Sequence, residues 1–83
     1  MKNMKAYKIT YGIKGDTNEL YKLRFSDAKA VYFKYKKHYM SIKDIESYTE
    51  NRNLKGMFKD FWSFSAVIEN KVWEVSIVPI EIG

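Results

Sequence analysis

The residues that could do chemistry are few in this chain. A catalytic metal site needs three or more His, Cys, Asp or Glu ligands that converge, but the sequence has no cysteine and a single histidine, His38. His38 follows two lysines near the end of a helical pattern, where a partly exposed side chain is a far commoner outcome than a catalytic base. We therefore expect no metal site and no cofactor.

Acids that lie close in the sequence are the other candidates for catalysis. Asp44 with Glu46, and Glu69 with Glu74, could each supply the two carboxylates that acid–base mechanisms use. The first pair lies in a polar segment and the second lies around a predicted hairpin turn, and carboxylates in both settings are normally solvated rather than held against each other. We therefore predict that the protein is not an enzyme.

Aromatic residues, in contrast, are abundant. Seven Tyr, five Phe and two Trp stand among 83 residues, and each ring carries an apolar area on the order of 150–250 Å². A chain of this length buries about 60–65% of the surface that its unfolded form exposes. We predict a single compact domain over residues 1–83, with some of the rings left at the surface.

The net charge of +5 comes mostly from lysine, because Arg24 and Arg52 are the two arginines among fifteen basic residues. Arginine is the side chain that forks onto phosphates and base edges, so an excess of lysine is weaker support for nucleic-acid binding. No apolar run reaches the length of about 18 residues that a membrane-spanning helix needs, and the N-terminus lacks the hydrophobic stretch of a signal peptide. We expect a cytoplasmic protein with no membrane partner.

A β-hairpin and a helix are predicted for the first half of the chain. Apolar and polar residues alternate from Lys5 to Ile13 and again from Tyr21 to Phe25, with turn residues between them. Ser26-Asp27 then stands where a helix N-cap belongs. The residues after this cap repeat at helical spacing and form one apolar stripe, which consists of Ala28, Val31, Tyr32, Tyr35 and Tyr39.

The middle of the chain has a mixed pattern. The segment Ser41–Glu50 fits a helix and a short strand equally well, and residues 51–53 form a polar break. A short amphipathic helix that ends near Trp62 is expected from four residues at helical spacing, Leu54, Met57, Phe58 and Phe61.

A second hairpin is predicted for the last part of the chain. Residues 64–68 and 73–77 alternate in polarity, and residues 69–71 between them have turn chemistry. Pro79 cannot donate a ladder hydrogen bond, so the strand 72–78 should stop there or lie at a sheet edge.

These elements predict an α+β fold, in which an antiparallel sheet of four to five strands, made of two hairpins, packs on one main helix plus one short helix. The strand residues expected to face the helix are Tyr7, Tyr11, Tyr21 and Trp73. The opposite face would then be polar and would carry Lys8, Thr10, Lys22, Arg24, Val67, Glu74 and Ser76.

Phe33 lies on the side of the predicted helix opposite the apolar stripe, beside lysines. Its ring either faces solvent as a contact residue or tucks under the segment 41–53. Trp62 and Phe64 raise the same question, since one of two neighbouring rings at an element junction usually points outward. The candidate partner-binding residues are Phe33, Lys34, Lys37, Trp62 and Phe64.

We therefore expect a small non-enzymatic binding module, monomeric or homodimeric, that docks on a protein or ribonucleoprotein partner through exposed aromatics ringed by lysines. The alternative is a protein that binds single-stranded RNA or DNA, because aromatics among lysines combine base stacking with attraction to the backbone. The candidate residues for that alternative are Lys8, Lys22, Arg24, Lys34, Lys36 and Lys37.

In length and composition the chain is similar to the small Lys-, Tyr- and Ile-rich accessory proteins of phages and mobile elements in AT-rich hosts, and it carries no motif of a known family. Several such proteins bind and block a host enzyme or defence complex. The resemblance implies an inhibitor or regulator of a host complex that acts in the host cytoplasm, and it assigns a role to no specific residue.

Overall fold

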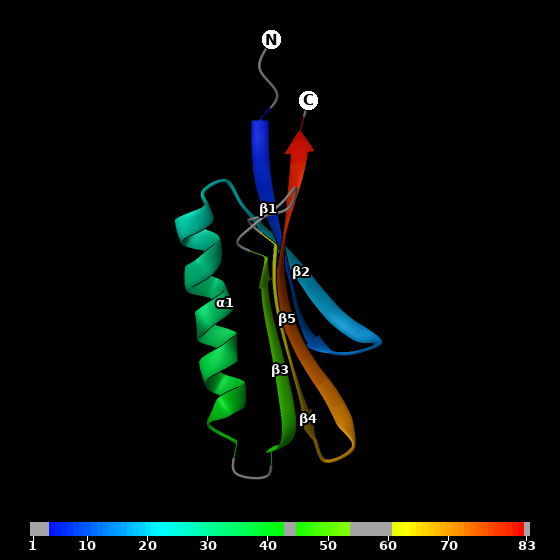
Figure 1. Cartoon of the computed structure of the whole chain (residues 1–83). Helices are drawn as coiled ribbons and strands as arrows, with labels where there is room; N and C mark the ends of the chain where they lie inside the picture. Colours follow the sequence, from blue (N-terminus) through cyan, green and yellow to red (C-terminus); the bar gives the residue numbers. More distant parts are fainter. Residues whose placement is uncertain (1–3, 43–44, 54–60, 83) are drawn as a thin grey trace.

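The structure of the protein, a computed structural model, describes residues 4–42, 45–53 and 61–82. Within these residues one antiparallel five-stranded sheet packs against one helix (Figure 1). The predicted α+β class and both predicted hairpins are confirmed. The elements in chain order are β1 (Met4–Ile13), β2 (Asp16–Lys22), α1 (Phe25–Met40), β3 (Ile45–Asn53), β4 (Phe61–Ile68) and β5 (Lys71–Ile82).

The strands lie in the order β2-β1-β5-β4-β3, so the pairing of β1 with β5 joins the two hairpins. This ladder runs from Met4 opposite Ile82 to Ile13 opposite Trp73, which places the start of β1 beside the end of β5 (Figure 1). β2 pairs with β1 at one edge of the sheet, and β3 pairs with β4 at the other. The two central strands therefore hold both halves of the chain together.

A two-residue turn joins β4 to β5. Glu69 and Asn70 have φ angles of 52° and 63°, and the residues that flank them, Ile68 and Lys71, pair directly. Two successive left-handed residues are typical of a type I′ turn, whose twist matches that of the strands it connects. The turn predicted at residues 69–71 is thus confirmed, with Lys71 as the first residue of β5.

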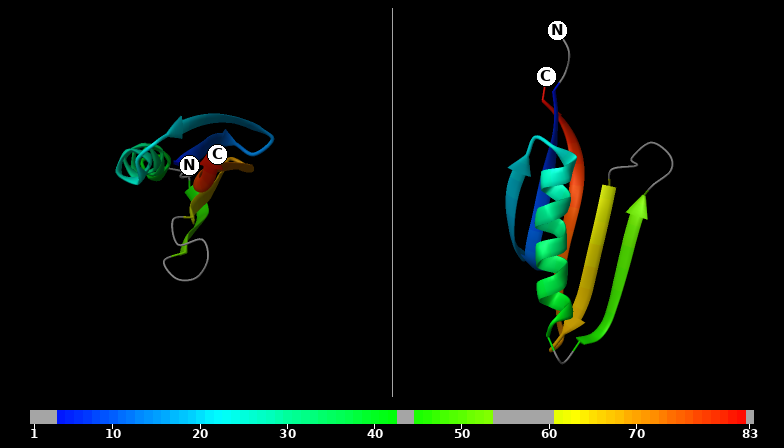
Figure 2. Two further views of the ribbon diagram at one scale, coloured as in Figure 1. Left: turned by 90° about the horizontal axis from the view of Figure 1, so that it is seen from above. Right: turned by 90° about the vertical axis from the view of Figure 1, so that its left-hand side faces the viewer.

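The core lies between α1 and one face of the sheet. α1 lies over the β2–β1–β5 part of that face, and β4 and β3 extend beyond the helix (Figure 2). The predicted stripe is confirmed on the helix, where Ala28, Tyr32 and Tyr39 are buried. Alternate strand residues complete the core, namely Tyr7, Ile9, Trp62, Phe64, Ala66, Ile68, Val75 and Ile77.

The expected break at Pro79 is wrong, because β5 continues to Ile82 and its last residues pair with β1. The Lys14 N–H donates to the Val72 carbonyl over 2.8 Å. Hydrogen-bonded and non-bonded residue pairs alternate along an antiparallel ladder, so this bond means that even-numbered residues of β5 bond to β1. Odd-numbered positions, including 79, face away from β1. β4 pairs with β5 only as far as Ile77 in the described part of the chain, so the proline lacks its N–H where no described strand needs it.

Tyr21 does not face the helix, contrary to expectation. Tyr21 pairs with Lys8, and Lys22 pairs with Tyr7. Cross-strand neighbours share a face of the sheet, so Tyr21 lies on the open face and Lys22 lies on the helix side. The prediction failed because β2 begins at Asp16, and its polar first half has no alternation that reveals the orientation of an edge strand.

The helix begins earlier than predicted, at Phe25, with Arg24 as its N-cap. The Phe25 ring lies 5.2 Å from the ring of Tyr7 and 5.5 Å from that of Trp62. Partial burial of this ring against the core accompanies the place of Phe25 in the first turn of α1 rather than at the end of a strand. Ser26-Asp27 therefore lies inside the first turn, where the acidic side chain complements the helix dipole.

The middle of the chain contains a strand, where the sequence pattern fitted a helix and a strand equally well. Residues 45–53 form β3, so the polar break expected at 51–53 is wrong. The short helix predicted there is not seen in the described residues, because Phe61 and Trp62 belong to β4. The other residues of that prediction, Leu54, Met57 and Phe58, lie outside the described residues.

The hydroxyl of Tyr39 ties the end of α1 to the two central strands. It accepts a hydrogen bond from the Gly12 N–H over 3.1 Å and donates one to the Glu74 carbonyl over 3.2 Å. Gly12 and Glu74 face each other in the β1–β5 ladder. Burial raises the pKa of Tyr39, which keeps the hydroxyl protonated and able to donate.

We predict that Tyr39→Phe lowers the free energy of unfolding by about 1–2 kcal/mol, because it removes a partner from two partly buried backbone groups and keeps the ring. Urea denaturation followed by tryptophan fluorescence measures the change. Tyr21→Phe is the matched control, since it removes an exposed hydroxyl and should change stability by less than about 0.5 kcal/mol. Equal effects of the two substitutions would contradict this role of Tyr39.

Candidate functional site

Phe33 lies at the side of α1 that borders β4 and β3. Its ring is 5.4 Å from the ring of Tyr32 and 5.7 Å from that of Trp62, both in edge-to-face geometry. The Arg52 guanidinium of β3 lies 5.3 Å from the same ring, and the Lys36 ammonium lies 6.0 Å from it. Even so, Phe33 remains 41% exposed. The two readings of the sequence both hold in part, since the ring packs on β3 and still reaches solvent.

Arg52 is placed by the register of β3 on β4. It pairs directly with Trp62, and its guanidinium lies 4.5 Å from the centre of the indole ring. A cation at this distance over tryptophan is attracted by the negative face of the ring. Within the described residues the Nε1 donor of Trp62 is buried without a hydrogen-bond partner, so this ring is held by packing and by the arginine.

Glu50 links β3 to the helix. Its carboxylate accepts hydrogen bonds from the Lys36 ammonium, at 2.8 and 2.9 Å, and from the Tyr32 hydroxyl at 2.6 Å. Arg52 approaches the same carboxylate at 3.4 Å. Partial burial acts to raise the pKa of Glu50, but the hydrogen bonds from Lys36 and Tyr32 and the two positive charges hold that pKa below its ordinary value. The pKa of Tyr32 is raised, mainly by burial and to a smaller extent by the hydrogen bond to Glu50.

Tyr48 extends the same surface along β3. It pairs with Ala66, two pairs along the ladder from Glu50 opposite Phe64. Its ring stacks on that of Phe64 with a centroid distance of 6.0 Å. Tyr48 is 59% exposed. We use the name α1–β3 surface for the five residues Phe33, Lys36, Tyr48, Glu50 and Arg52.

Trp62 and Phe64 are buried, at 7% and 1% exposure, so the expectation that one of them points outward is wrong. Both belong to β4 at positions two residues apart, which puts both rings on the face that packs toward the helix. They form the floor beneath the exposed side chains of Phe33 and Tyr48. The prediction that one of the two rings points outward assumed a junction between a short helix and a strand. Because both residues lie in β4, both rings face the core.

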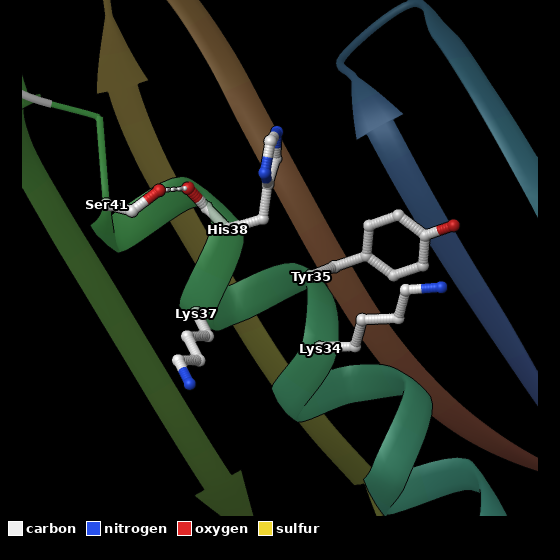
Figure 3. Close-up of a pocket in the computed structure, with 5 residues that line it drawn as sticks. All are labelled: Lys34, Tyr35, Lys37, His38 and Ser41. Carbon is white, nitrogen blue, oxygen red and sulfur yellow. Dashed lines mark hydrogen bonds between the residues drawn. The ribbon is translucent and has the colours of Figure 1, made fainter.

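Lys34 and Lys37 are exposed on α1, and Lys37 follows Phe33 by four residues, which puts it on the same side of the helix as that ring. They line a shallow hollow of about 480 Å³ on α1, together with Tyr35, His38 and Ser41. In Figure 3 the side chains of Lys34 and Lys37 point away from each other. The hollow therefore presents separate positive charges rather than a converging set.

The six cations of the nucleic-acid alternative are not gathered on one face. Lys8 lies on the open face, where it forms an ion pair with Glu19 at 3.4 Å. Lys36 is paired with Glu50 on the helix side. The other four are exposed or partly exposed at separate places, Lys22 at the end of β2, Arg24 at the N-cap of α1, and Lys34 and Lys37 on α1.

The open face of the sheet carries a polar depression of about 200 Å³. Its side chains are short and mostly hydroxyl-bearing, and they come from β3, β4 and β5. They are Thr49, Asn51, Ser63, Ser65, Glu74 and Ser76. The expectation of a polar open face is met by Lys8, Thr10, Glu74 and Ser76, whose register places them there, while Tyr21 adds an aromatic ring.

No group of three or more His, Cys, Asp or Glu side chains that could hold a metal ion occurs in the described residues. His38 is exposed in the last turn of α1, as expected. Glu69 lies in the β4–β5 turn and Glu74 lies in β5, whereas Asp44 is outside the described residues. The one helix in the described parts of the chain is too short and too polar to cross a membrane.

Comparison of the chain with protein-family models, with curated proteins and with solved structures finds no match. What the protein does is therefore inferred from its own residues.

Four residues of the α1–β3 surface were missed from the sequence as partner-binding candidates. Lys36 was placed in the nucleic-acid set alone, and the other three are Tyr48, Glu50 and Arg52 of β3. These three occupy alternate positions in a stretch that is otherwise polar. That alternation was the available signal, but without an apolar face it does not distinguish a strand from a polar loop.

We predict that Glu50 contributes stability that disappears in acid. Its pKa is lower in the folded chain, so the contribution is present above the ordinary glutamate pKa of 4.5 and is lost as pH falls through the folded value. The free energy of unfolding of the wild type should exceed that of Glu50→Gln by about 1–2 kcal/mol near neutral pH. This difference should disappear below about pH 4. Urea titrations across this range measure it.

Glu19→Gln is the matched control, because Glu19 pairs with Lys8 in a more exposed setting. Such pairs contribute about 0–1 kcal/mol to stability. The free energy of unfolding of Glu19→Gln should therefore stay close to that of the wild type over the whole pH range. A gap for Glu50→Gln that stays constant down to acid pH would contradict the role of the ionised carboxylate.

Proposed function

We propose that the protein is a non-enzymatic binding module that docks on a protein or ribonucleoprotein partner through the α1–β3 surface. The observation that carries this proposal is the setting of Phe33, which stays 41% exposed although two rings and two cations surround it. A large apolar ring held in place at the surface loses little conformational freedom when a partner covers it.

The composition of the surface supports the same conclusion. Aromatic side chains and arginine dominate the binding energy of protein interfaces, and such residues cluster where a partner can exclude water from them. Phe33 and Tyr48 supply the exposed rings, and Lys36 and Arg52 supply cations beside them. The net charge of +5 favours a partner with an acidic surface, because complementary charge speeds encounter.

The resemblance to phage accessory proteins supplies a narrower form of the proposal, in which the partner is a host complex that the protein inhibits or regulates. A small domain with exposed rings on its α1–β3 surface is suited to such a role, since binding alone can block access to a larger complex. In this form Trp62 and Phe64 act as supports beneath the contact residues, and Lys37, one helical turn after Phe33, lies at the border of the contact.

We predict that Phe33→Ala weakens partner binding by roughly tenfold or more, the scale of a lost hot-spot residue. The partner is found by affinity purification from cells that carry the gene, and the dissociation constant is then measured with purified components. Tyr21→Ala is the matched control, because Tyr21 is an exposed ring on the opposite face of the sheet. Circular dichroism confirms that both variants fold, and equal binding by both would remove the α1–β3 surface as the contact.

Single-stranded nucleic acid remains the second candidate, supported by the hollow on α1 that two lysines line with Tyr35 and His38. A single strand could stack a base on the tyrosine while its phosphates meet the lysines. We predict binding that weakens steeply with salt, and that weakens uniformly across sequences in Lys34→Gln/Lys37→Gln. Absence of any mobility shift at about 50 mM salt would remove this candidate.

A further inference from the structure

Arg52 carries a guanidinium that lies over two rings from different elements. The guanidinium is 4.5 Å from the centre of the Trp62 ring on β4 and 5.3 Å from that of the Phe33 ring on α1. Contact with aromatic faces restricts where a guanidinium can move. The side chain is therefore positioned before a partner arrives, and little of its conformational freedom is lost when its N–H groups bind.

This guanidinium has donors to spare within the described residues. It carries five N–H groups, and it donates from one terminal nitrogen, Nη2, to Glu50 over 3.4 Å. The Glu50 oxygens are bonded more closely by Lys36, at 2.8 and 2.9 Å, and by Tyr32 at 2.6 Å. The Arg52 side chain remains 35% exposed, so a second acceptor can reach its other donors.

The charges of this cluster do not cancel. Lys36 and Arg52 each carry a positive charge, and Glu50 carries the negative charge that both of them approach. Lys36 holds the shorter ion pair, at 2.8 Å against 3.4 Å, so the excess positive charge rests mainly on Arg52. One further carboxylate beside the guanidinium would neutralise the cluster.

We propose that Arg52 receives the carboxylate of an Asp or Glu side chain of a protein partner through two parallel hydrogen bonds, while an apolar side chain next to that carboxylate covers Phe33. A planar carboxylate matches the fork of a guanidinium in this way. This inference rests on the proposed function, because it names what the partner presents to the α1–β3 surface.

The apolar contact and the ion pair support each other. A side chain that covers Phe33 also removes water from the guanidinium 5.3 Å away. An ion pair left in solvent adds little to affinity, whereas a hydrogen-bonded pair from which water is excluded can add much more. The position of Arg52 beside an exposed ring is therefore what makes a carboxylate contact effective here.

A nucleic-acid strand fits this surface less well. It carries a charge at every phosphate and is bound along a groove of several cations, whereas here one excess positive charge has a carboxylate, Glu50, beside it. A second copy of the chain fits no better, because the same excess positive charge would meet itself.

Nuclear magnetic resonance can test the contact, because the two arginines of the chain give separate Nε–H signals. Arg24, at the N-cap of α1, is the internal control for Arg52. The probe is a short peptide of alternating glutamate and leucine, added at millimolar concentration to the isotopically labelled full chain. The Arg52 signal should shift while the Arg24 signal stays in place, and the same peptide with glutamine instead of glutamate should shift neither.

Arg52→Lys tests the fork separately from the charge. Lysine keeps the positive charge but lacks the planar set of donors, so binding of the glutamate peptide should weaken by about tenfold. Arg24→Lys is the matched control and should bind as the wild type does. Circular dichroism checks that both variants fold, and the titration of the unsubstituted chain does not depend on either of them.

The inference is overturned if the Arg52 signal does not move, if both arginines shift alike, if Arg52→Lys binds the peptide as tightly as the wild type, or if oligouridine shifts the Arg52 signal more than the peptide does. The natural partner separates this inference from the proposed function. A partner that is lost with Phe33→Ala but bound normally by Arg52→Lys would keep the α1–β3 surface and remove the carboxylate contact. A partner that both variants bind normally would remove the surface itself.

Discussion

A single helix is too narrow to cover one face of a five-stranded sheet, and the rest of the structure depends on how the uncovered part of that face is closed. A helix is about 10–12 Å across with its side chains, whereas five strands about 4.8 Å apart span roughly 19 Å. α1 lies over the β2–β1–β5 part of the sheet and leaves β4 and β3 beyond it (Figure 2). The hydroxyl of Tyr39 bonds to both central strands, so the position of the helix over them is held by hydrogen bonds as well as by packing.

Long side chains cover what the helix does not. Lys36 crosses from α1 to Glu50 on β3, and the Arg52 guanidinium lies 4.5 Å from the centre of the Trp62 indole ring. Charged groups can close a half-buried surface when each is paired or stacked, because their alkyl stems bury apolar area while the charged heads stay near water. The same arrangement leaves Phe33 and Tyr48 partly uncovered. The surface that we propose for partner binding is thus a consequence of how this small fold closes its core.

Both hairpins, the apolar stripe of α1 and the scarcity of groups that bind metals can be predicted from the amino-acid pattern, because period-two and helical repeats and composition are local properties of the chain. Three features emerge only in the folded chain: β3 is a strand, Trp62 and Phe64 are both buried, and the Arg52 guanidinium lies near the Trp62 ring. The physical reason is that an edge strand is held by backbone hydrogen bonds, which any residue can make, and that its side chains meet neighbours from distant parts of the chain. Glu50 and Tyr32 are separated by eighteen positions, and only the folded chain brings their oxygens to 2.6 Å.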